Sequence, residues 1–82
     1  MYFELSIFEL LVDEDNEPML LDHILTDTKE KCIGTIHRLA GSLKKNEYFE
    51  IFNDETQETL YFLADGTEVK SYKEIVRILT EN

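Results

Sequence analysis

The sequence predicts an α+β fold: a small antiparallel sheet of about four strands with two helices on one face, in the order ββαββα. Three patterns support this prediction. Two pairs of strand-like segments are each joined by a polar turn, one long segment has the apolar spacing of a helix, and a helix-capping signature lies near the C-terminus. Because 82 residues can build one modest core, we expect residues 1–82 to form a single compact domain.

Residues 2–12 fit two periodicities, since their apolar side chains match both the spacing of a helix and the alternation of a strand. The polar segment 13–18, which ends in Pro18, and the short apolar segment 19–25 follow directly. Two apolar segments joined by such a loop are typical of a hairpin. We therefore interpret residues 2–12 as a strand.

The clearest helix signal follows this hairpin. Apolar side chains recur at spacings of three and four through residues 32–43, and Asp27 stands three residues before Glu30, as in a helix N-cap with its capping box. The C-terminal end of this helix can be placed at two positions. Either Gly41 ends the helix in the left-handed conformation, or the helix continues to Lys45.

The second half repeats the pattern of hairpin and helix. Residues 47–53 and 58–64 are rich in aromatic and β-branched side chains and predict two paired strands. A tight-turn signal at 65–66 precedes 67–69, where a short additional strand is an option. The Ser-x-x-Glu sequence at 71–74 predicts the start of the second helix.

Charge is strongly negative and segregated along the chain. Eighteen Asp and Glu oppose eight Lys and Arg, a net charge of −10, which argues against direct binding to nucleic acid or anionic membranes and favours a basic protein surface. Residues 1–25 and 46–69 each hold seven acids and no Lys or Arg. With both helices on one face, the other face of the sheet and the loop tips should be acidic.

No sequence motif indicates a catalytic, cofactor or metal site, so we expect no enzyme activity and no cofactor. Asp13, Asp15 and Glu17 resemble the start of a calcium loop, but Pro18 stands where that loop needs glycine and Ile24 where it needs glutamate. The single cysteine and two histidines lack zinc-ligand spacing. One cysteine, no basic leader and no apolar run of about 20 residues favour a cytoplasmic location.

Aromatic side chains suggest a protein-binding surface. Eight of nine lie in strand segments, more than one face of a small sheet needs, so some should stand among carboxylates on the face away from the helices. The candidate partner-binding residues are Asp13, Glu14, Asp15, Glu17, Glu47, Tyr48, Glu50, Phe52, Asp54, Glu55, Glu58 and Tyr61.

In size, acidity and lack of catalytic motifs, the chain resembles small acidic phage-encoded host-takeover and anti-defence proteins, some of which mimic DNA. That resemblance implies an inhibitor that occupies the nucleic-acid site of a polymerase, a nuclease or a nucleoid protein. Carboxylates on alternate strand residues lie ~6.6 Å apart, close to the ~7 Å between neighbouring phosphates of a duplex. The alternative is a structural assembly domain that homodimerises through an aromatic sheet face, with its charge serving solubility.

Overall fold

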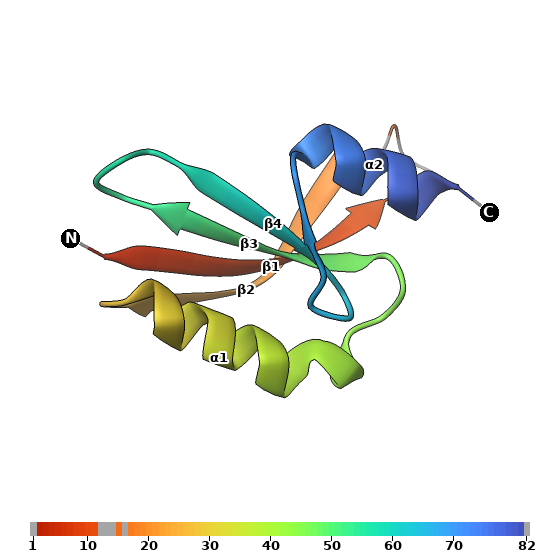
Figure 1. The fold of residues 1–82 in the computed structure, drawn as a ribbon. Coiled ribbons are helices and arrows are strands. Elements are labelled where there is room, and N and C mark those ends of the chain that lie inside the picture. The colour runs from red at the N-terminus through yellow and green to blue at the C-terminus, as the bar shows by residue number, and fades with distance from the viewer. Residues whose placement is uncertain (1, 12–14, 16, 82) are drawn as a thin grey trace.

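The chain forms a five-stranded antiparallel sheet flanked by two helices in the computed structural model, which describes residues 2–11, 15 and 17–81 (Figure 1). The sheet has the spatial order β2-β1-β3-β4-β5. The predicted α+β class is confirmed. The predicted order ββαββα lacks one strand, because residues 68–69, near the short strand considered as an option, do form β5 and make the order ββαβββα. In chain order the elements are β1 (Phe3–Leu11), β2 (Glu17–Thr26), α1 (Lys29–Leu39), a 3₁₀ turn (Ala40–Ser42), β3 (Glu47–Asn53), β4 (Thr59–Leu63), β5 (Glu68–Val69) and α2 (Tyr72–Thr80).

β1 is an interior strand that pairs antiparallel with β2 on one side and β3 on the other. This confirms the strand interpretation of its segment. Successive side chains of a strand point to opposite faces of the sheet, so β1 supplies apolar groups to both faces. β2 carries a bulge at Leu21, where the register shifts from Ile7 opposite Asp22 to Phe8 opposite Leu20.

α1 covers one face of the sheet, which we call the α1 face. The spacing of its apolar side chains brings Cys32 and Ile36 down onto the strands, where both are fully buried. This arrangement forms the larger core cluster. Its other buried members, all from strands, are Leu5, Ile7, Phe49, Ile51 and Phe62.

α2 packs on the opposite face, which we call the α2 face, so the prediction of both helices on one face is wrong (Figure 1). Ile75 is fully buried there, against Leu10 and Tyr48 of the strands. These residues have even numbers in β1 and β3, whereas the residues of the same strands that pack under α1 have odd numbers. The sheet is therefore apolar on both sides. Two apolar faces need two covering helices, one on each side.

The ends of α1 also differ from expectation. Thr28 is the N-cap, because its Oγ1 accepts a hydrogen bond from the Lys31 amide at 3.2 Å; the prediction of Asp27 is one residue out. The Asp27 carboxylate instead accepts from Lys31 Nζ at 2.7 Å, which lowers the Asp27 pKa. α1 ends at Leu39 and runs into the 3₁₀ turn, so it follows neither of the two alternatives considered.

Two local predictions in the C-terminal half are confirmed. Gly66 has φ +90° in the turn after β4, a conformation that glycine adopts without steric cost. Ser71 caps α2 by accepting a hydrogen bond from the Glu74 amide at 3.3 Å. Neither helix in the described ranges is long and apolar enough to cross a membrane.

Candidate interaction surface

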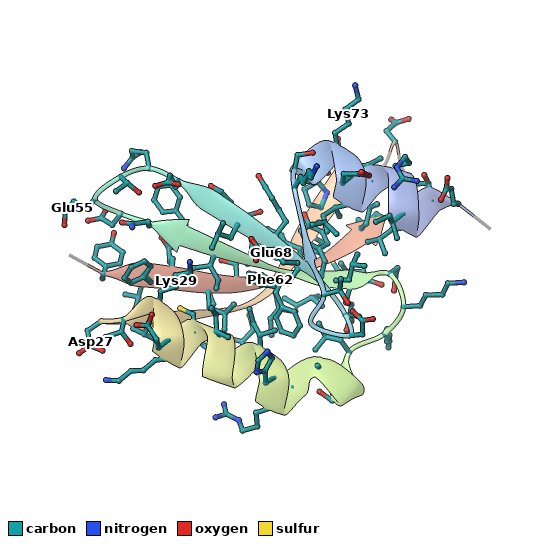
Figure 2. The ribbon with its side chains drawn as sticks, in the orientation of Figure 1. Asp27, Lys29, Glu55, Phe62, Glu68 and Lys73 are labelled. Carbon is teal, nitrogen blue, oxygen red and sulfur yellow. The ribbon has the colours of Figure 1, made fainter. Side chains whose placement is uncertain are left out.

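The acidic residues predicted to bind a partner do not form one surface. The β1–β2 and β3–β4 connections lie at opposite ends of β1, whose nine residues span about 26 Å. Asp15 and Glu17 belong to the first connection and the start of β2, and both are exposed. Glu55 points outward from the tip of the β3–β4 connection (Figure 2). Asp13 and Glu14 lie outside the described residues.

Two further predicted acids belong to the α1 face. Glu47 accepts a hydrogen bond from the Lys44 amide at 2.8 Å, which ties its carboxylate to the chain before β3. Glu58 lines a hollow of about 90 Å³ together with Lys29 of α1. Glu47 and Glu58 therefore face away from Glu50, and an interaction surface that includes all three is wrong.

The tyrosines of the prediction lie mostly under α2. Tyr48 is 1% exposed, and its ring stacks on Phe8 with centroids 5.5 Å apart. Tyr61 is partly buried, and its ring centroid lies 6.2 Å from that of Tyr72 in α2. The expectation that Tyr48 stands on an open face is wrong, because α2 needs it as core; Tyr61 reaches only the margin of an open surface.

α2 covers only part of its face, over the Leu10 end of β1. The part near the N-terminal end of β1 carries polar, acidic and exposed apolar side chains that belong to neither core cluster. We call it the open half-face; its residues are Tyr2, Glu4, Ser6, His23, Leu25, Glu50, Phe52 and Asp54.

Glu4 and Glu50 are the two carboxylates at its centre. Glu4 lies opposite Phe52 in the ladder and Glu50 lies opposite Ser6, so the two acids are diagonal neighbours on adjacent strands. Diagonal neighbours are about 7–8 Å apart. Burial, and then the negative charge of Glu4, raises the pKa of Glu50. Over residues 2–11, 15 and 17–81, no Lys or Arg forms an ion pair with either acid.

Two polar contacts extend this acidic centre. Nε2 of His23 on β2 lies 2.5 Å from Oε1 of Glu4, and both side chains stay partly exposed. At the N-terminal end, a hydrogen bond to the Asp54 carboxylate, followed by its charge, raises the pKa of the Tyr2 phenol. The surface therefore has an excess of negative charge, and the base that contacts it in an ion pair among the described residues is a histidine.

Apolar side chains flank the carboxylates. Leu25 of β2 is 57% exposed and lies opposite Glu4, while Phe52 is partly exposed on β3. Exposed apolar side chains next to carboxylates are typical of a protein-binding surface. In the part of the chain that is described, no three His, Cys, Asp or Glu side chains are placed to hold a metal ion.

A scan of family models, a search of curated proteins and a search of solved structures each found no match for the chain.

Sequence reasoning identified Glu50, Phe52 and Asp54 of the open half-face and missed Glu4 and His23. Glu4 was not among the predicted partner-binding residues because it lies inside an apolar segment, apart from the runs of acids. Its sequence signal is the alternation of the strand: Glu4 and Ser6 are polar, lie two residues apart and therefore share the face opposite Leu5. The contact with His23 depends on the hairpin register, which the sequence does not specify.

Proposed function

We propose that this chain is a non-enzymatic acidic interaction protein that inhibits or modulates a basic, nucleic-acid-binding partner by occupying its binding surface, as DNA mimics do. The partner class that fits is a polymerase, a nuclease or a nucleoid protein. The observation that carries the proposal is the Glu4–Glu50 pair, two acids at diagonal positions on adjacent strands that form no ion pair with a Lys or Arg among the described residues.

The energetics of this pair favour a cationic ligand. Burial first, and then repulsion from the like charge of Glu4, raises the pKa of Glu50, so its ionised form is disfavoured on this surface. A lysine or arginine from a partner relieves the repulsion, because each carboxylate then gains an opposite charge. The diagonal spacing of about 7–8 Å also resembles the ~7 Å between adjacent phosphates, which supports the mimicry.

The alternative, a homodimer through an aromatic sheet face, has less surface to use. Tyr48 is buried beneath α2, and Phe8 and Tyr61 pack into the same cluster. Of the strand aromatics on the α2 face, Tyr2 and Phe52 remain outside that cluster. The acidic half-face is therefore the better-supported interface.

The test is affinity capture from the native host with three baits. One is the wild type, one carries Glu4→Lys with Glu50→Lys, and one carries Glu30→Lys with Glu68→Lys, which removes the same charge from exposed positions elsewhere. We expect a basic nucleic-acid-binding protein with the wild type and the control but not with the Glu4/Glu50 variant. Equal capture by both variants would show that only overall charge matters.

A further inference from the structure

The two edges of the sheet are built differently. β5 has two residues and leads into α2, so it offers almost no backbone for pairing with another strand. β2 at the other edge has ten residues. Proteins usually protect such an edge with lysines, prolines or bulges. β2 has no lysine, and its Pro18 and its bulge at Leu21 both precede the regular stretch Asp22–Thr26.

The backbone of this stretch has hydrogen-bonding groups on its outer side. The His23 amide donates to Oδ1 of its neighbour Asp22 at 2.8 Å, so it points away from β1. Backbone groups alternate in direction along an antiparallel strand, so Leu25 faces outward as well. An incoming strand with a cation beside Asp22 would neutralise that carboxylate and leave the His23 amide for pairing.

Apolar exposure is concentrated on the same strand. Leu25 and Leu20 are 57% and 53% exposed. Among the described residues, the exposed large apolar side chains other than Tyr2 all belong to β2; they are Met19, Leu20, Leu21 and Leu25. An uncovered edge with this much apolar surface is the arrangement to which peptides bind as an added strand.

We propose that β2 is a docking edge for an extended segment of the partner that alternates basic and apolar residues and pairs as a sixth strand. The proposal rests on the function proposed above, from which it takes the basic partner. Charge selects this occupant. β2 contributes Glu17 and Asp22 but no Lys or Arg, so a second copy would bring like charges together, whereas a basic strand brings opposite ones.

The experiment uses an acetylated octapeptide of alternating lysine and valine. Its control is the same peptide N-methylated at every residue, which keeps the charge but removes every backbone donor. We expect the unmodified peptide to bind and to slow amide hydrogen exchange at His23 and Leu25. The methylated peptide should bind about tenfold more weakly. Equal binding of the two peptides would overturn strand pairing.

Two variants of the edge sharpen the result. Leu20→Lys with Leu25→Lys places charge on exposed positions and should abolish peptide binding, whereas Leu20→Val with Leu25→Val keeps the apolar surface and should retain it. If amide hydrogen exchange at His23 and Leu25 slows with rising protein concentration alone, and the peptide slows it no further, a second copy occupies the edge and the proposal is wrong.

The two proposals can fail separately. A native partner that is lost with Glu4→Lys and Glu50→Lys, but still captured by the Leu20→Lys and Leu25→Lys variant, would uphold the proposed function and overturn the docking edge. A native partner that ignores Glu4 and Glu50 would overturn the proposed function, while the peptide experiment would still decide whether β2 accepts a basic strand.

Discussion

The Glu50 carboxylate lies between a like charge, Glu4, and the tyrosines at the margin of α2. Burial, and then the charge of Glu4, raises its pKa above the ordinary 4.5, so just above pH 4.5 the folded protein binds more protons than the unfolded chain. Stability therefore falls as the pH rises through that window, and ionised Glu50 destabilises the fold at neutral pH.

We predict that Glu50→Gln is more stable than the wild type at pH 7, because it removes a charge that burial, and then repulsion from Glu4, disfavours. The advantage should shrink as the pH falls toward 4.5, where the wild-type carboxyl becomes protonated. Urea unfolding of both proteins at several pH values measures this difference in the free energy of unfolding. Glu55→Gln, on the exposed hairpin tip, is the charge-matched control. An advantage of Glu50→Gln that is constant with pH would contradict the account.

Gly34 lies inside α1, where a Cβ atom would meet nothing within 4 Å. Glycine in a helix interior costs about 0.5–1 kcal/mol relative to alanine. We predict that Gly34→Ala stabilises the fold by about that amount in thermal unfolding. Gly66→Ala is the contrasting variant: its φ of +90° strains an alanine, and we expect a loss of about 1–3 kcal/mol.

At the scale of elements, α2 is held by a small cluster centred on Ile75, which is fully buried against Leu10 and Tyr48. We predict that Ile75→Ala costs about 2–5 kcal/mol and loosens α2 first. On heating this variant, the near-ultraviolet circular dichroism signal, which reports the packing of Tyr48, Tyr61 and Tyr72, should weaken at a lower temperature than the far-ultraviolet signal does. Simultaneous loss of both signals would mean that α2 does not separate from the sheet on its own.

The sequence predicted those elements whose signals are local. Strand alternation, the turn at Gly66 and the cap at Ser71 depend on a few neighbouring residues. The start of α1 was missed by one position because Asp and Thr are both favoured N-caps, and the Asp27 carboxylate binds Lys31 instead. The choice between them depends on which side chain reaches the helix amides.

The side of the sheet that each helix covers is a tertiary property, and there the prediction failed. Phe8 and Tyr48 have the opposite parity to Leu5 and Phe49, which is the trace of a second apolar face in the sequence. The surplus of strand aromatics was noticed but assigned to exposure. Most of those side chains form the core beneath α2, because an aromatic side chain stabilises the fold more when it is buried than when it is exposed.

At the scale of the whole molecule, charge segregation predicted an acidic protein but not which acids share a surface. The chain extends 37 Å along its longest axis, and the two acidic connections lie at opposite ends of β1. Glu50 and Glu58 belong to opposite faces, so reversing them together would probe two different surfaces. The proposed surface depends on Glu4 and Glu50, which only the strand register brings together.

Competition with duplex DNA for the captured partner tests the central claim most directly. We predict that the wild type displaces the DNA, with an apparent affinity that falls steeply between low and moderate salt. The Glu30→Lys, Glu68→Lys control should compete nearly as well, and the Glu4→Lys, Glu50→Lys variant should fail. Competition that ignores salt, or that survives reversal of Glu4 and Glu50, would contradict the account.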